Sequence, residues 1–442
     1  MKRREFLSAG AAATVAGVGL STPLADGATA SSPPGRGLDG MVQTGFDVLA
    51  AGHYQLVAGK KLGIISNPTG IVHDLSHEVD VMHASSEVNL TAVFGPEHGF
   101  RGTAQAGGSE GFSTDPATGL PVYDLFGAGI SDMAGIFTKS GIEVLSFDIQ
   151  DIGARFYTYI WTMYQSMAAA AVLGMPYVVL DRPNPIGGVA PTGPIMHPGF
   201  ESGVGLKPIA QQHAMTVGEL AQLFNDQFVP GDANGKKADL TVVPMRGWRR
   251  GHYFDETGLP WVMPSPNVPT LDTAIVYPGF GMFEGSNFAE GRGTTRPFEL
   301  VAAPYGDYRL REALTQENLP GTAFRENYFT PTFGKYSGPA TTLGGIQVYI
   351  TDRDAFDAIR TALTVMVTAR RLYPNDWSFN GFELDGGPAF AHNWMDFLSG
   401  SEWIRTSVDA GKTTDAIIAG WQGELKQFAK LRDKYLIYRT EA

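Results

Sequence analysis

The sequence VLSFDIQDIG, residues 144–153, is a short apolar run that changes halfway into a polar loop ending in glycine. The same change follows the apolar runs at residues 62–65, 90–94 and 177–180, and residues 240–243 form a fifth run. Short apolar runs bounded by turn residues are typical of buried strands. Helical patterns lie between several of these runs, and strands that alternate with helices predict an α/β fold with a parallel sheet.

Two stretches between the runs have the spacing of helices. One apolar face recurs at intervals of three and four residues and consists of Ile160, Met163, Tyr164, Met167, Ala168 and Ala171. A second helix is predicted from Thr216 to Phe228. Thr216 is its expected N-cap, and Glu219 stands three residues further on, where a capping box requires an acidic or amide side chain.

The loops that follow the first four strands predict a site. In open parallel sheets, ligands bind beyond the carboxyl ends of the strands. Turns need only residues such as Gly, Asn and Asp. The formation of turns does not require the side chains of Glu97, His98, Arg155 and Arg182. Their presence therefore favours a shared active cleft over four unrelated turns.

Composition excludes several classes of protein. At about 150 residues per domain, 442 residues predict two or three domains. The 33 basic and 45 acidic residues give a net charge of −12, which favours neither a nucleic-acid partner nor an anionic membrane surface. Cysteine is absent, which excludes disulfides, thiolate metal sites and cysteine nucleophiles.

The N-terminus has the pattern of an export signal. Residues 2–7 read KRREFL, residues 6–20 are mildly apolar, and Ala28-Thr29-Ala30 offers a small-x-small cleavage site. We expect a twin-arginine signal over residues 1–30 and a protein that is periplasmic or extracellular. A membrane anchor is the weaker interpretation, because the apolar stretch is shorter than the ~20 residues of a spanning helix.

The proline-rich stretch Pro264–Pro269 marks a change of organisation. The glycine-rich stretch Tyr277–Gly293 follows, and then a smaller α/β unit. A strand is predicted at residues 346–351, with Asp352 or Asp354 as the cap of a helix whose apolar face runs from Phe356 to Met366. A last helix is predicted over residues 414–438.

Two common catalytic motifs are absent from the sequence. No Walker A loop or H-E-x-x-H pair occurs, and Gly279-Phe280-Gly281 is too short to predict a nucleotide site. His73, His77 and His83 either bind zinc or form a polar surface face. The second interpretation is favoured because no third ligand has zinc-site spacing. We therefore predict no metal and no cofactor.

Carboxylates, one loop histidine and arginines remain, and these suit acid/base hydrolysis of glycosidic bonds. Glu97 is the best candidate acid, with an N-cap or a salt bridge as its alternative role. His98 either orients Glu97 or a water, or is a neutral loop histidine. Asp148 and Asp151 either position a sugar hydroxyl or a water, or cap a helix.

Arg292 and Arg296 flank the sequence Gly-Thr-Thr. The two side chains either clamp a substrate carboxylate through paired hydrogen bonds or form an interdomain salt bridge.

Seven long stretches together resemble the NamZ-type exo-β-N-acetylmuramidases, long catalogued as a domain of unknown function. They are residues 63–70 (GIISNPTG), 94–102 (FGPEHGFRG), 122–127 (VYDLFG), 147–159 (FDIQDIGARFYTY), 181–188 (DRPNPIGG), 213–221 (HAMTVGELA) and 284–299 (EGSNFAEGRGTTRPFE). The aromatic pattern Trp421, Phe428, Tyr435 and Tyr438 fits as well. The resemblance covers nearly all of residues 39–442.

The resemblance implies a fold and an activity. It implies a Rossmann-like catalytic domain over residues 39–272 and a smaller α/β auxiliary domain over 273–442. The implied activity releases N-acetylmuramic acid from the non-reducing end of peptidoglycan fragments, and Glu97 matches the family's catalytic glutamate. The second carboxylate and the anomeric outcome stay open, since the sugar's own 2-acetamido group can serve as nucleophile.

The lactyl carboxylate of muramic acid requires local cations, and Arg155, Arg182, Arg292 and Arg296 stand in the matching loops. The other polar residues of the matching stretches that we expect to bind substrate are Asn67, Asn184, His213, Glu284, Asn287 and Glu290. The expected partners are peptidoglycan-derived muro-saccharides, with no nucleic acid and no membrane anchor after signal cleavage. The oligomeric state stays open.

Two other functions fit the same residues. One is a non-catalytic muropeptide-binding protein of the cell envelope. The other is an amidase or esterase acting on cell-wall peptides or acyl groups, which the missing zinc motif disfavours.

Overall fold

Seven strands form the central sheet of the computed structural model, which describes residues 41–338, 341–381 and 390–438. The expected signal over residues 1–30 lies outside the described residues. The strands stand in the order β3-β4-β2-β1-β5-β6-β9. Their bounds are β1 Lys61–Ser66, β2 Asn89–Gly95, β3 Ser113–Thr114, β4 Pro121–Asp124, β5 Val144–Asp148, β6 Pro176–Leu180 and β9 Asp239–Val243.

All neighbouring strands of this sheet are parallel except β3 and β4. The five predicted strands are confirmed as β1, β2, β5, β6 and β9, and the α/β class is confirmed with them. Ser66 at the end of β1 pairs in register with Asp148 at the end of β5. The polar loops after the strands therefore leave the sheet from one edge.

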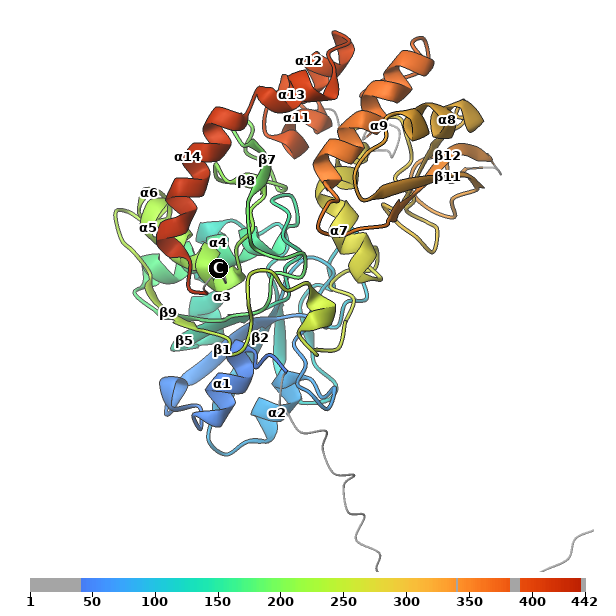
Figure 1. Ribbon diagram of the computed structural model, residues 1–442. Helices are drawn as coiled ribbons and strands as arrows, with labels where there is room; N and C mark the ends of the chain where they lie inside the picture. Colours follow the sequence, from blue (N-terminus) through green and yellow to red (C-terminus); the bar gives the residue numbers. More distant parts are fainter. Residues whose placement is uncertain (1–40, 339–340, 382–389, 439–442) are drawn as a thin grey trace, which may run out of the picture. The chain divides into compact units, whose positions relative to one another are not determined.

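Alternate residues of the strands enter two separate cores. On one face Ile64, Val93 and Val178 pack with Phe46 of α1 (Gly45–Ala51) and Val79 of α2 (Glu78–Ala84). The opposite face carries α3 (Ile130–Ser140), α4 (Tyr159–Leu173), α5 (Val217–Gln227) and α6 (Val229–Asp232) (Figure 1). Because successive strand residues point to opposite faces, short uninterrupted apolar runs supply both cores.

Helix α5 confirms its predicted cap. The Thr216 hydroxyl accepts a hydrogen bond from the Glu219 N–H, and the Glu219 carboxylate accepts one from the Thr216 N–H. The helix ends at Gln227, within one residue of the prediction. The predicted face of Ile160 to Ala171 is confirmed in α4, whose residues are buried on nearly every side.

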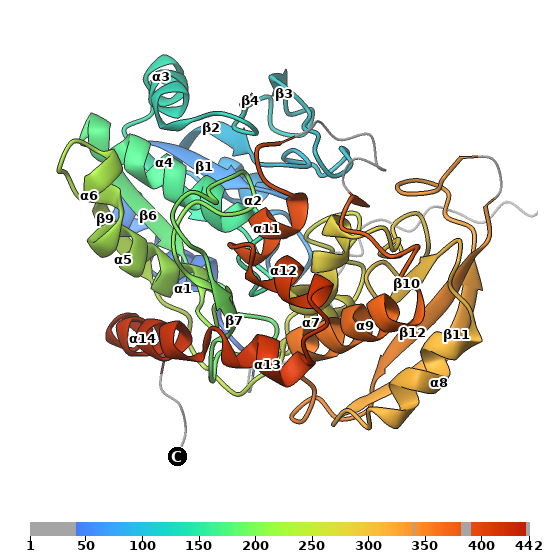
Figure 2. The ribbon, with the colours of Figure 1, turned by 90° about the horizontal axis from the view of Figure 1, so that it is seen from above.

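The chain after residue 270 builds a three-stranded antiparallel sheet in the order β10-β12-β11. Figure 2 shows α7 and α9 side by side next to this sheet. The bounds are α7 Leu271–Phe280, β10 Leu300–Ala303, α8 Tyr308–Gln316, β11 Thr322–Phe329, β12 Leu343–Ile350 and α9 Ala358–Leu372. A separate hairpin joins β7 (Thr192–Ile195) and β8 (Ala210–Gln212).

Two predictions about this part were wrong. The cap of α9 is Asp357, whose side chain accepts from the Arg360 N–H, and not Asp352 or Asp354. The last helix is broken into α13 (Thr414–Ala419) and α14 (Gln422–Arg432), followed by a 3₁₀ turn at Asp433–Tyr435. The break falls at Gly420, where any side chain would overlap the Trp403 ring.

The short helices α11 (Trp394–Ser399) and α12 (Trp403–Asp409) precede this break. Within the described ranges, no helix is both long enough and apolar enough to cross a membrane. The proposed division at residue 272 stays a prediction.

Candidate active site

A pocket of about 410 Å³ opens at the carboxyl ends of the sheet strands. Its polar wall contains Glu97, His98, Thr158, Glu284 and Arg292. Aromatic side chains form much of the rest, namely Phe126, Phe156, Tyr157, Tyr159, Tyr277, Phe298, Phe333 and Trp394. Pockets with apolar walls and a few polar groups are typical of small-molecule sites.

Glu97 stands in the loop directly after β2, and its half-buried carboxylate is held at both oxygens. Oε1 accepts a hydrogen bond from the Gly107 N–H at 2.8 Å, and Oε2 accepts one from the Thr158 hydroxyl at 2.6 Å. The loop turns at Gly99, whose φ of 85° is a left-handed conformation that favours glycine. The carboxylate is thus fixed in a pocket wall by groups far from it in sequence.

His98 is a buried neighbour of Glu97 with a defined ring orientation. Its φ of 71° is unusual for a residue with a side chain. Nδ1 lies 3.0 Å from the carbonyl oxygen of Ala104 and therefore carries the hydrogen of this bond. In the neutral ring, Nε2 is then the acceptor.

Arg292 is the cation of the pocket, and two carboxylates hold it. It pairs with Glu284 and, at 3.3 Å from its Nε, with Glu290. Burial alone would raise the pKa of Glu290, but Lys335, 2.9 Å away, and Arg292 outweigh it and hold that pKa below its usual range. Glu290 is therefore an ionised, buried anchor, while Glu284 and Arg292 face the pocket.

Tyr157 and Tyr277 supply neutral hydroxyl groups. Burial raises the pKa of both phenols well above the ordinary value, and the nearby carboxylates add to the effect at Tyr277. Both hydroxyls therefore keep their protons at neutral pH. The rings pack edge to face with centroids 5.7 Å apart, and Phe298 packs on Tyr277 at 4.7 Å.

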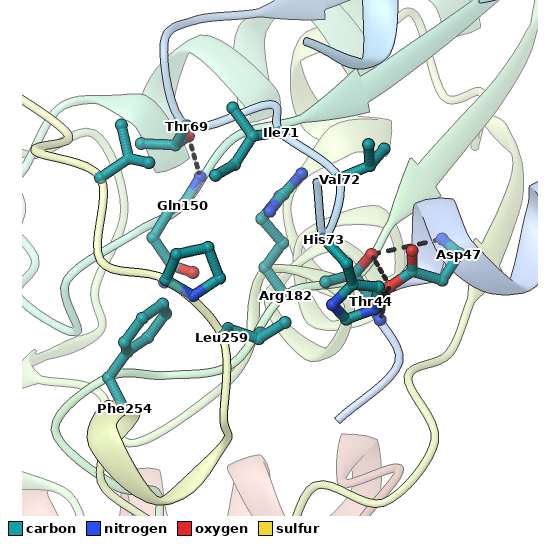
Figure 3. Close-up of a pocket in the computed structure, with 12 residues that line it drawn as sticks. Thr44, Asp47, Thr69, Ile71, Val72, His73, Gln150, Arg182, Phe254 and Leu259 are labelled. Carbon is teal, nitrogen blue, oxygen red and sulfur yellow. Dashed lines mark hydrogen bonds and ion pairs between the residues drawn. The ribbon is translucent and has the colours of Figure 1, made fainter. Parts of the chain in front are cut away.

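Asp148 and Arg182 lie outside this pocket, in a buried charge cluster. Arg182 pairs with Asp148 and lies 3.7 Å from Glu78. Burial and the neighbouring Asp148 carboxylate raise the pKa of Glu78 well above the ordinary value. Arg182 lines a separate small hollow of about 20 Å³. Figure 3 shows its side chain reaching toward Ile71 and Val72.

Asp151 is buried beside His213. Asp151 Oδ2 accepts from the Gly153 N–H at 2.7 Å and from His213 Nε2 at 3.1 Å. His213 Nδ1 accepts from the Met215 N–H, which sets the tautomer. Asn184 is also structural, since it bonds the Met215 carbonyl and the Ile186 N–H.

Asn67 and Arg155 are buried below the strand ends. Asn67 Oδ1 accepts from both the N–H and the hydroxyl of Thr69. Arg155 is fully buried and donates to the carbonyl of Leu398, and burial lowers its pKa to about 9. Neither residue lines the Glu97 pocket.

Asn287 and Arg296 stand in the 284–299 stretch but lie away from the pocket. Asn287 bonds the Asp376 carbonyl, the Tyr305 hydroxyl and the Ser378 N–H. The half-exposed Arg296 pairs with Glu299 at 3.1 Å.

The three histidines proposed as a polar surface face do not form one. His77 is buried and caps α2, with Nδ1 accepting from the Val79 N–H, whereas His83 is exposed. In the described part of the chain, the only group of three close potential metal ligands is His392, Asp396 and Glu402.

Sequence reasoning named Glu97, His98, Glu284 and Arg292 but not the hydroxyl groups around them. Thr158, Tyr157 and Tyr159 all stand in the FDIQDIGARFYTY stretch. The stretch as a whole could be recognised from the sequence, but the roles of these three residues could not. Tyr277, Ser265 and Asn267 reach the pocket from the glycine-rich and proline-rich stretches, whose patterns predicted a change of organisation and no site residue.

A glutamate in a small-molecule pocket is compatible with glycoside hydrolysis, in which Asp and Glu side chains transfer the proton. Family models described as "Exo-beta-N-acetylmuramidase NamZ", N-terminal and C-terminal, match residues 62–272 and 275–438. The chain is 47% identical over 398 residues to the peptidoglycan beta-N-acetylmuramidase NamZ of Bacillus subtilis strain 168, with 90% of this chain and 91% of that protein covered.

Two solved structures are similar to this chain over most of its length. A DUF1343 family protein of Bacteroides fragilis superposes with a TM-score of 0.79 at 33% identity, covering 90% of this chain and 100% of that one. A second DUF1343 protein of the same organism gives 0.66 at 28% identity, covering 90% and 99%. The chain is a glycoside hydrolase. It belongs to the NamZ exo-β-N-acetylmuramidase family.

Proposed function

We propose that this protein removes N-acetylmuramic acid from the non-reducing end of peptidoglycan fragments, with Glu97 as the acid/base. The relative from Bacillus subtilis carries the name peptidoglycan beta-N-acetylmuramidase, which supports the substrate class. One observation supports Glu97 as the acid/base. It is a pocket carboxylate held at both oxygens by uncharged donors, the Gly107 N–H and the Thr158 hydroxyl.

In this mechanism, protonated Glu97 gives its proton to the glycosidic oxygen as the bond to the anomeric carbon breaks. The carboxylate then takes a proton from the attacking water. Glu284, the other pocket carboxylate, is paired with Arg292. The 2-acetamido oxygen of the sugar attacks the anomeric carbon in the first step, and water then opens the cyclic intermediate, so a single free glutamate serves as acid and then as base.

The test is Glu97→Gln, assayed with a chromogenic β-linked N-acetylmuramide. Glutamine keeps the volume and the bond to the Gly107 N–H but has no transferable proton, so we expect a loss of about 10²–10⁴-fold in kcat. Glu312→Gln, on the exposed surface of α8, is the matched control and should keep full activity. A loss below tenfold in Glu97→Gln, with an unchanged melting temperature, would contradict the role of Glu97. Binding of the sugar by the native protein without release of product would favour a binding protein instead.

We also propose export through the twin-arginine pathway, on the basis of Arg3, Arg4 and the apolar stretch after them. The pair Arg3→Lys and Arg4→Lys keeps the charge and removes the recognised arginines. Retention of the double variant in the cytoplasm, with export of the unaltered chain, is the expected result. Equal export of both would contradict the proposal.

A further inference from the structure

Thr158 occupies the N-cap position of α4, yet its side chain makes no capping hydrogen bond. At four other helices the N-cap is also a threonine, and there the hydroxyl accepts from the backbone N–H three residues further on. These are Thr44, Thr216, Thr270 and Thr413. A threonine that leaves its helix uncapped departs from the pattern of these four threonine N-caps. Such departures are expected where a side chain serves a functional site.

The hydroxyl of Thr158 is used by Glu97 instead. It lies 2.6 Å from Glu97 Oε2, across 61 residues of sequence. The backbone of Thr158 is helical, with φ −72° and ψ −14°, whereas an N-cap residue normally is extended. This conformation turns the hydroxyl away from the first turn of α4 and toward the pocket.

The two oxygens of Glu97 are therefore not equivalent. The Gly107 N–H can only donate, and the carbonyl oxygen of a carboxylic acid is a stronger acceptor than its hydroxyl oxygen. A proton on Glu97 is therefore favoured on Oε2. A threonine hydroxyl both donates and accepts, so Thr158 can donate to the ionised carboxylate and accept from the protonated acid.

We propose that Thr158 is a positioning residue that fixes the Glu97 carboxyl and makes Oε2 the oxygen that gives and takes the proton. The inference rests on the proposed role of Glu97 and adds to it the identity of the transferring atom. Other titratable groups face the same pocket, namely His98, Tyr157, Tyr159, Tyr277, Glu284 and Arg292. The test must therefore separate Thr158 from these groups.

Thr158→Val removes the hydroxyl at nearly constant shape, and Thr158→Ser restores it. We expect the valine variant to lose about 10–100-fold in kcat, with KM changed less than about threefold, because positioning acts on the chemical step. The serine variant should return to within about threefold of the native kcat.

The melting temperature separates positioning from folding. Because the Thr158 hydroxyl does not cap α4, Thr158→Val should melt within about 2 °C of the native protein. A native kcat in the valine variant would overturn the proposal, and so would equal losses in the valine and serine variants.

Combining each change with Glu97→Gln completes the test. If Glu97→Gln shows the expected loss of about 10²–10⁴-fold, Thr158→Val should not lower the residual activity of that variant further, whereas an additional loss would show that Thr158 acts elsewhere. If Glu97→Gln keeps its activity, the proposed role of Glu97 fails. That outcome differs from a failure of Thr158 alone, in which Glu97→Gln is inactive and Thr158→Val is unaffected.

Discussion

At the scale of single residues, Arg292 is the cation best placed to recognise the lactyl carboxylate. Burial would lower the pKa of its guanidinium, but Glu284 and Glu290 outweigh burial and raise it, so the charge is permanent. Arg296 was an equal candidate from the sequence, but its side chain is half exposed and paired with Glu299 away from the pocket. The sequence alone could not distinguish Arg292 from Arg296, but their positions in the fold do.

We predict that Arg292→Lys lowers kcat/KM for an N-acetylmuramide by about 10–100-fold and changes the value for an N-acetylglucosaminide little. Lysine keeps the charge beside Glu284 and Glu290 but loses the forked donor that matches a carboxylate. Kinetics with both sugars on the same leaving group checks this, and Arg296→Lys is the matched control. A parallel loss on both sugars would contradict recognition of the lactyl group by Arg292.

At the scale of elements, the loop after β2 depends on close packing at Gly99. A side chain at residue 99 would overlap the carboxyl end of Glu110. Glu110 in turn accepts hydrogen bonds from the N–H groups of Arg101 and Thr103 and from the Thr103 hydroxyl. Glu110 thus ties together the loop that presents Glu97 and, through Gly107, holds it.

We predict that Gly99→Ala lowers kcat at least tenfold, because it displaces Glu110 and strains a residue at φ 85°. Gly111→Ala is a matched control, since Gly111 has a φ of 69° but open space around its α-carbon. The Gly111→Ala variant should have the same backbone strain but no overlap with a neighbouring side chain, and it should therefore keep most of its activity. Equal kcat values in the two variants would show that the overlap at Gly99 does not matter.

Elements defined by local patterns were predictable, and those defined by distant contacts were not. The α5 cap follows from Thr216 and Glu219 alone, and both lie within one turn. The break at Gly420 depends on Trp403, which packs from another helix. Likewise Glu97 is visible in its own loop, whereas Thr158 gains its role only because α4 begins beside that loop.

At the scale of the whole molecule, the C-terminal segment is fastened to the central sheet. The Tyr438 hydroxyl donates to Asp181 Oδ2 at 2.6 Å, just after the end of β6. The Ile437 N–H donates to Glu219 of α5, and Arg432 bonds the carbonyls of Gly188 and Ala214. Residues near the end of the chain thereby complete the structure of its first half.

This fastening should make stability depend on pH through Asp181. Burial is the main cause that raises the pKa of Asp181 to about 7, from an ordinary value of 3.8, against the opposing hydrogen bonds from Tyr438, Gly218 and Thr216. Between about pH 4 and pH 7 the folded protein keeps a proton that the unfolded chain has lost. The contribution of Asp181 to stability is therefore full below pH 4, falls as the pH rises to about 7, and is constant above that.

We predict that Asp181→Asn has a flatter dependence of melting temperature on pH between 5 and 7 than the native protein. Asparagine is neutral throughout, and the hydroxyls of Thr216 and Tyr438 can accept from its amide where they donated to Oδ2. Thermal melts at intervals of half a pH unit measure the difference. Glu78 is also a buried carboxyl with a raised pKa, but it remains in both proteins and cancels from the comparison. Identical slopes in the two proteins would show that Asp181 does not titrate in this window.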